Sequence, residues 1–227
     1  KEWNKVTDCI AGQRAVKEKS TDYLPLMEGA QKGDVRYGNY IDRAVFVNYT
    51  GRTKDGLLGA VFRKPAEVEV PDALEYIIDN ADGAGESLES LTKDVATEVI
   101  GKGRHFLLVD FPEVTKGMTL EEQQLLQPQA SINRYTCEQA INWRAAVKNG
   151  RKMLDLVVLQ EVYDANDDEF EYEEAIQYRV LRLRDGVYTQ QVYRDGHPHT
   201  EEVTPRKANG QPFSEIPCIF IGSENND

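Results

Sequence analysis

Cysteine, positive charge and long apolar runs are all scarce in this chain of 227 residues, and each shortage excludes a class of protein. The three cysteines, Cys9, Cys137 and Cys218, lie far apart and form no Cys-x-x-Cys pair. That spacing excludes a zinc ribbon and argues against a disulfide scaffold, so we expect three reduced thiols. No apolar run approaches the ~20 residues that a membrane helix needs, and no basic-then-apolar leader opens the sequence.

The charge balance limits what the chain can bind. Its formal net charge is −12, from 27 Lys and Arg against 39 Asp and Glu. Tight DNA binding requires basic side chains that neutralise phosphates and release their counterions, so we expect no strong grip on nucleic acid. An acidic surface remains compatible with DNA that slides past without sticking.

The first half of the chain has helical periodicity. Apolar positions predict a short helix over residues 3–11 and a longer helical pattern over 37–62, with a break near Gly51 and Gly56. Pro71 is typical of a first helical turn and opens a further helix. Its predicted inward positions are Leu74, Ile77 and Ile78.

A helix–strand unit follows. Ser87 is predicted to cap a helix that Gly101 and Gly103 end, and residues 105–111 then have the composition of a buried strand. The apolar positions of this helix are Leu88, Leu91, Val95 and Val99. A helix that feeds a buried strand in this way indicates a mixed α and β domain.

The second half changes to alternating periodicity. Strands are predicted over 132–136, 142–148, 153–163, 176–184, 187–194 and 216–221, with one helical turn over 137–141. Asp-Gly pairs at 185–186 and 195–196 predict tight hairpins and hence an antiparallel meander. We therefore predict an α+β fold. Its parts are a helical region with one buried strand (1–112), a polar loop (113–131) and an antiparallel β-rich region (132–227), which together form one composite domain.

Metal chemistry has one candidate. His197, His199 and Glu201 would point to one face of a strand and could hold a metal ion. Glu202 is the alternative to Glu201 as the acidic ligand. The other interpretation is a polar loop. The residues thus leave open a metal-dependent enzyme or a binding protein with a His/His/Glu site, although we predict no metal, no cofactor and no catalytic residue.

The run 161–174 contains eight acidic residues and no basic one. A cation-binding edge, a patch for a partner and a solvated hairpin tip are all consistent with it, and the solvated tip is favoured because charge runs usually face water. Aromatic residues near this run and on the following strands could be surface residues that contact other protein chains, or they could form cross-strand pairs. They are Tyr163, Tyr172, Tyr188 and Tyr193.

An ordered set of short segments covers nearly the whole chain. None is diagnostic alone, and none is a catalytic motif. They are Asp8, Gly12-Gln13-Arg14-Ala15-Val16-Lys17, Tyr23-Leu24-Pro25, Arg43-Ala44, Arg52-Thr53, Gly59, Phe62, Asp82-Gly83, Gly85, Gly103-Arg104, Leu108-Val109-Asp110, Pro112, Tyr135, Ile141-Asn142-Trp143, Leu159, Glu161 and Tyr178-Arg179-Val180-Leu181.

Together these segments resemble a family of bacteriophage structural proteins that are similar to portal proteins. The resemblance implies the N-terminal wing region of a ring of subunits at the head–tail connector of a phage or prophage, a structural role without enzymatic activity. It implies that the chain is an N-terminal fragment of a longer protein, since nothing after Ile221 would form the stem, clip or crown.

The resemblance also implies partners and a location. The expected partners are copies of the chain itself, the capsid and scaffold proteins, the packaging motor and the tail adaptor, with DNA passing through the ring. The location would be the virion, and the host cytoplasm during assembly, with no membrane association.

Overall fold

The computed structural model describes residues 2–111, 129–148, 150–166, 168–207 and 210–222. The fold is α+β, with a helical N-terminal half followed by antiparallel sheets, as the periodicity predicts. The chain divides into two compact units. The first, here the helical unit, comprises residues 1–69 and 92–103, and the second, the sheet unit, comprises 70–91 and 104–222.

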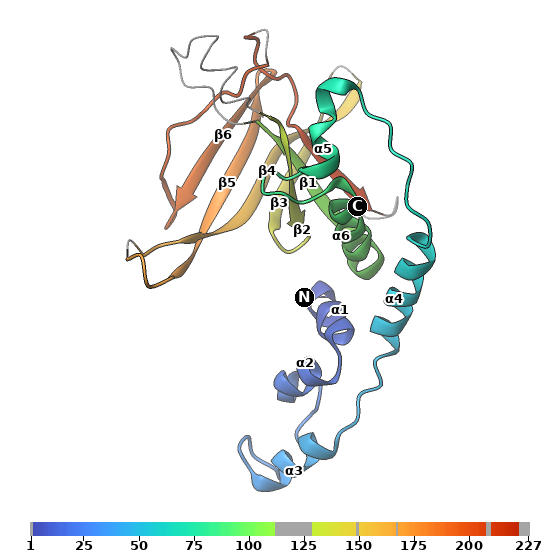
Figure 1. Cartoon of the computed structure of the whole chain (residues 1–227). Coiled ribbons are helices and arrows are strands. Elements are labelled where there is room, and N and C mark those ends of the chain that lie inside the picture. Colours follow the sequence, from blue (N-terminus) through green and yellow to red (C-terminus); the bar gives the residue numbers. More distant parts are fainter. Residues whose placement is uncertain (1, 112–128, 149, 167, 208–209, 223–227) are drawn as a thin grey trace. The chain divides into compact units, whose positions relative to one another are not determined.

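The helical unit contains short helices that the sequence predicts only in part. They are α1 (Glu2–Ala11), α2 (Gln13–Glu18), the 3-10 turn η1 (Ser20–Asp22), α3 (Val35–Arg43) and α4 (Tyr49–Val61), as Figure 1 shows in blue to teal.

Asn48 joins α4 to α1. Its side-chain oxygen accepts a hydrogen bond from the Gly51 N–H at 2.7 Å and so caps the start of α4. The same amide donates from Nδ2 to the carbonyl oxygen of Ile10 at 2.8 Å, near the end of α1. One half-buried side chain therefore both caps a helix and bonds to its neighbour.

Tyrosine hydroxyls hold the connections of this unit. The Tyr23 hydroxyl donates to Asp8 Oδ2 at 2.6 Å, and this bond raises the pKa of Tyr23 to about 12. The Tyr37 hydroxyl donates to the carbonyl oxygen of Leu24 at 2.5 Å. Because Tyr37 itself is buried, this bond attaches the start of the loop between η1 and α3 to a buried side chain of α3.

Helix α6 (Leu88–Lys102) matches its sequence prediction closely. The Ser90 N–H donates to Ser87 Oγ at 3.2 Å, which confirms Ser87 as its cap. Leu91 and Val95 are buried, as their spacing predicts. Only Gly103 ends the helix, with a φ of 80° that favours glycine, whereas Gly101 lies inside the last turn.

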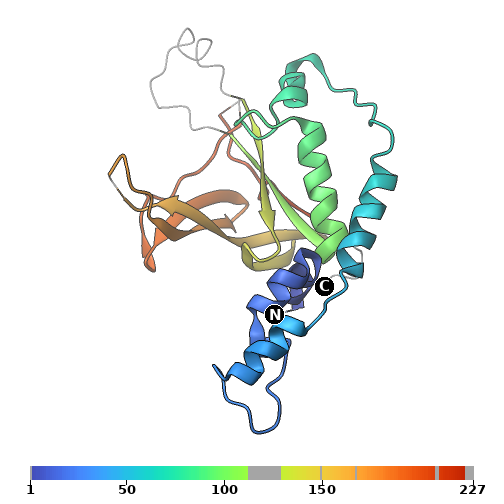
Figure 2. The same cartoon turned by 60° about the horizontal axis from the view of Figure 1, so that its bottom comes forward.

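The sheet unit contains two antiparallel sheets. The first has the order β2-β1-β8 and the second is the meander β3-β4-β5-β6-β7. The bounds are β1 Arg104–Asp110, β2 Ser131–Thr136, β3 Ala140–Lys148, β4 Arg151–Asp164, β5 Glu174–Arg184, β6 Val187–Arg194, β7 His197–Pro198 and β8 Cys218–Gly222. Figures 1 and 2 show that the hairpin between β4 and β5, drawn in orange, extends away from the rest of the sheets in both views.

The core of this unit is formed by alternate residues of the two sheets. Apolar side chains with no more than 4% exposure point inward from β1, β4 and β5. They are Phe106, Leu108, Val157, Leu159, Leu181 and Leu183. Phe106 of β1 also contacts Trp143 of β3 and Phe220 of β8, with ring centroids 5.6 and 4.4 Å apart. Aromatic packing thus joins the two sheets at one end.

The predicted strands agree with the observed ones to within two residues at either end. Two local predictions are wrong. Residues 137–139 form a hydrogen-bonded turn and not a helical one, because the Gln139 side chain accepts from the Thr136 N–H at 2.8 Å. The helical pattern over 37–62 is broken at 44–48, where Val45 is exposed, and not at Gly51 or Gly56.

The helix predicted after Pro71 is also shorter than expected. It is a 3-10 turn, η2 (Asp72–Leu74), followed by the single α-turn α5 (Tyr76–Asp79). The change of period moves Leu74 and Ile78 to exposed positions, so the prediction that they face inward is wrong. Residues 112–128, most of the predicted polar loop, lie outside the described residues.

A matched pair of substitutions in α4 tests the role of Asn48. Gly51→Ala would place a Cβ 2.6 Å from Asn48 Nδ2 and 2.9 Å from the Ile10 carbonyl oxygen. We expect it to lower the free energy of unfolding by about 1–3 kcal/mol. Gly59→Ala, in the same helix, meets nothing within 4 Å and should raise it by about 0.5–1 kcal/mol. Urea unfolding followed by circular dichroism measures both, and equal effects would contradict this account.

Candidate functional site

The most elaborate polar cluster among the described residues lies on the inner face of the meander, beside the apolar core. Leu159 and Glu161 of β4 share this face with Leu181 and Arg179 of β5, because strand residues alternate between faces. Leu159 pairs with Arg179, and Glu161 pairs with Gln177. Along each strand, the face therefore changes from an apolar to a charged side chain at the next inward-facing position.

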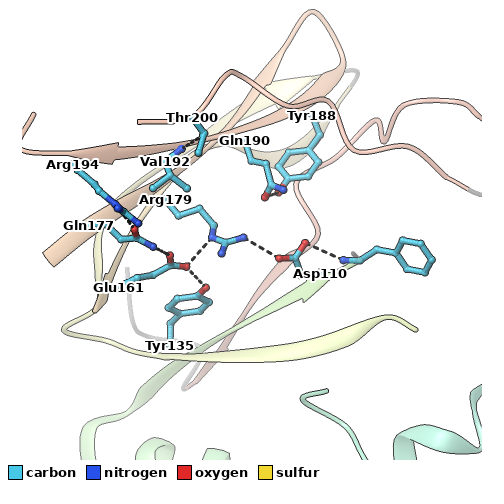
Figure 3. Close-up of polar contacts among 11 residues, drawn as sticks. Asp110, Tyr135, Glu161, Gln177, Arg179, Tyr188, Gln190, Val192, Arg194 and Thr200 are labelled. Carbon is cyan, nitrogen blue, oxygen red and sulfur yellow. Dashed lines mark hydrogen bonds and ion pairs between the residues drawn. The ribbon is translucent and has the colours of Figure 1, made fainter. Parts of the chain in front are cut away.

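Arg179 is the centre of the cluster and joins the two sheets. Its Nε donates to Glu161 Oε1 at 2.7 Å within the meander. Its Nη1 donates to Asp110 Oδ2 at 2.9 Å, at the end of β1 in the other sheet. Figure 3 shows the guanidinium lying between these two carboxylates. The exposed fractions of the three side chains are between 14% and 25%, so water screens these ion pairs less than surface pairs.

Further side chains extend the cluster along the meander (Figure 3). The Tyr135 hydroxyl, from β2, donates to Glu161 Oε1 at 2.7 Å, and Gln177 Nε2 donates to Glu161 Oε2 at 3.0 Å. Arg194 Nε donates to Gln177 Oε1 at 3.0 Å and lies over the ring of Tyr163 at 3.7 Å. We call these residues the inter-sheet network, namely Asp110, Tyr135, Glu161, Tyr163, Gln177, Arg179 and Arg194.

Two groups of the network have shifted pKa values, Arg179 and Tyr135. Burial disfavours the charged form of Arg179, but the carboxylates of Glu161 and Asp110 outweigh it, so the pKa of the guanidinium is raised. Burial, reinforced by Glu161, raises the pKa of Tyr135 well above that of a free phenol. Tyr135 therefore stays a neutral donor and Arg179 a fixed cation.

This arrangement gives Glu161 a structural role. Both oxygens of Glu161 already accept hydrogen bonds, three in all, and a general base needs an oxygen directed toward its substrate. The nearby Cys218 is a poor nucleophile, because burial raises the pKa of its thiol to about 12. The hydrogen bonds of the network hold the two sheets together.

The histidine candidates lie elsewhere. His197 is in β7, and His199 and Glu201 follow it, all three exposed. Glu202 accepts from Thr189 Oγ1 at 2.7 Å and lies 3.6 Å from Arg182 Nη1. Among the residues that the structure describes, no three His, Cys, Asp or Glu side chains gather to hold a metal ion. The structure does not bring the proposed triad together.

The acidic run has two parts. Glu161 points inward to Arg179 and does not belong to a solvated tip. The described residues between β4 and β5, 165–166 and 168–173, form the other part, and Phe170 and Tyr172 among them are exposed. Among the tyrosines, Tyr188 is buried, which corrects its assignment as a surface residue, and Tyr193 pairs across strands with Tyr178.

Sequence reasoning missed the inter-sheet network, although one signal for part of it was present. On the predicted strands, Glu161 and Arg179 have the same parity as the apolar Leu159 and Leu181. A charged residue in phase with the buried face requires a partner of opposite charge, and these two satisfy each other. Nothing in the sequence indicates that Asp110 is the second acid.

Comparison with known protein families found no match, and comparison with curated proteins found none either. Within the described part of the chain, no helix has the length and apolar character needed to cross a bilayer.

Removal of the central cation tests the network. Arg179→Met would leave the two carboxylates without their shared partner, and we expect it to lower the free energy of unfolding by about 3 kcal/mol. The matched control is Arg144→Met, since Arg144 is a largely exposed partner of Asp155 at 2.9 Å. Loss of that pair should cost less than about 1 kcal/mol. Similar urea midpoints for the two variants would show that the network does not hold the sheets.

The pH dependence of stability provides a second test. The raised pKa values of Cys218, Tyr135 and Tyr188 require these groups to stay protonated in the fold. The contribution of Cys218 is therefore complete below the ordinary thiol pKa of 9.0 and is lost as the pH rises through about 12, and the contributions of the two tyrosines are lost in the same direction above their ordinary pKa of 10.0. We expect the urea midpoint to fall steadily above pH 9, and Cys218→Ala to make that fall shallower. A midpoint that stays constant up to pH 11 would contradict these directions.

Proposed function

We propose that the chain is a structural component of a phage or prophage portal ring, the head–tail connector through which DNA is packaged and ejected. In this proposal the chain is the wing region. It supports its neighbours and catalyses no reaction. Its partners are copies of itself, the capsid and scaffold proteins, the packaging motor and the tail adaptor, and it acts in the virion after assembly in the host cytoplasm.

One observation carries this proposal. Four positions of the portal-like resemblance, Asp110, Tyr135, Glu161 and Arg179, come from four separate segments of the sequence. In the fold they meet in one hydrogen-bonded cluster. The segments that suggested a structural family are thus the ones that hold the scaffold together, which is expected if the pattern reflects a shared framework.

The charge of the chain also supports the proposal. A ring around translocating DNA must not bind it tightly, and a net charge of −12 disfavours phosphate contacts. A ring further needs a rigid subunit with two different lateral surfaces, because closed cyclic assemblies use head-to-tail contacts. The inter-sheet network supports the first of these requirements, a rigid subunit, because it joins the two sheets through Arg179.

Electron microscopy of the full-length protein tests this function. We expect rings with a central hole, and a detergent-free preparation at near-neutral pH is sufficient. Compact monomers or dimers across a range of protein and salt concentrations would contradict the proposal, and so would turnover of a small molecule that depends on His199.

A further inference from the structure

On the basis of the function proposed above, we propose that the tip of the β4–β5 hairpin docks on helix α4 of a neighbouring copy of the chain. Phe170 would enter a small pocket beside α4, and the acidic residues around it would face the more basic helical unit of that copy. The occupant of the pocket is thus a second copy of this protein.

The described residues of the hairpin tip include two exposed aromatic side chains. Phe170 is 93% exposed and Tyr172 is 66% exposed, an unusual environment for large aromatic residues. Side-chain carboxylates accept hydrogen bonds from backbone N–H groups at and next to these residues. Asp164 Oδ1 accepts from the Glu173 N–H at 3.0 Å, and Asp168 Oδ1 accepts from the Phe170 N–H at 2.9 Å. Residues that hydrogen bonds hold in place before binding lose little entropy when they dock.

The helical unit has a pocket of suitable size. Its volume is about 320 Å³, at the small end of the range for ligand sites and suited to one side chain. Residues of α1, α4 and α6 line it, among them Ile10, Tyr49, Thr53, Lys54, Leu57 and Ile100. Tyr49 and Leu57 at its rim are 71% and 51% exposed. Together with Val61, at 62%, they leave one face of α4 apolar and uncovered.

Charge complementarity identifies the partner. Residues 1–69 and 92–103 contain 14 basic and 12 acidic residues, residues 70–91 and 104–222 contain 13 basic and 25 acidic ones, and residues 223–227 add two more acidic ones. The strongest acidic run, eight acids without a base, surrounds Phe170, and Lys54 lies in the pocket. Opposite charges of this kind steer association and select the partner. Each copy therefore carries both an acidic aromatic tip and a more basic apolar pocket.

The two surfaces differ, so the contact is head-to-tail. Such a contact leaves one tip and one pocket open at the ends of any linear assembly, and it closes only when a ring is complete. It also allows a complementation test that neither a symmetric dimer nor nonspecific aggregation would pass.

The test uses sedimentation velocity of the 227-residue chain over a concentration series at low salt. We expect the wild type to form species larger than dimers. Phe170→Ala and Leu57→Asp should each weaken association at least tenfold, while an equimolar mixture of the two variants should form dimers and nothing larger, because one intact contact remains. The controls are Val147→Ala and Val35→Asp, which change residues that are 74% and 77% exposed on other segments. Both should associate like the wild type.

Several results would overturn the proposal. They are a wild type that remains monomeric at about 1 mM, association that survives both substitutions, and a variant mixture that stays monomeric. Far-UV circular dichroism checks the fold, and Thr53→Asp replaces Leu57→Asp if the latter alters the spectrum. Added salt should weaken the contact, since it screens exposed charges, and salt-independent association would contradict the charge argument.

Failure of this contact and failure of the proposed function are distinguishable. If the full-length wild type forms rings and its Phe170→Ala variant forms them equally well, the docking proposal is wrong and the portal function stands. If the wild type forms no rings, the portal function is wrong whatever the variants do.

Discussion

The sheet unit depends on a single cation held between two sheets. Arg179 is largely removed from water and has one carboxylate from each sheet as its partner. Loss of either acid would leave charge uncompensated in a poorly hydrated site, which is far more costly than loss of a surface ion pair. The sheets can therefore slide past each other only by breaking these bonds. The apolar core beside the network provides most of the burial, whereas the network fixes the register.

Strands were easier to predict than helices, for physical reasons. The alternation along 176–184 and 187–194 and the Asp-Gly turn between them depend on neighbouring residues alone, so the hairpin could be read from the sequence. The break between α3 and α4 depends on Asn48, whose side chain caps α4 by bonding to Gly51 and also bonds to Ile10, 38 residues away. Helical periodicity does not detect such a contact, and the pattern therefore continued through the break.

In the inter-sheet network, too, the contact between residues close in sequence was predictable and the contact between distant residues was not. The phase of Glu161 and Arg179 with their apolar neighbours could have been noticed, because both lie on one hairpin, 18 residues apart. The bond between Arg179 and Asp110 spans 69 residues and connects different sheets. No local pattern encodes it. The acidic surroundings of Glu161 concealed its role further, because an inward carboxylate resembles its solvated neighbours when only composition is considered.

The position of the network links rigidity to the proposed contact. Glu161 and Gln177 face each other at the base of the β4–β5 hairpin, three cross-strand pairs before its last pair, Asp164 and Glu174. The same two side chains are hydrogen-bonded to each other, and Gln177 accepts from Arg194 of β6. Hydrogen bonds thus hold the base of the hairpin to the sheet. At its far end, Asp164 accepts a hydrogen bond from the Glu173 N–H across the hairpin. Because its base is held, the hairpin projects in a fixed direction from the sheet. A subunit needs this when its contact must reach one site on its neighbour.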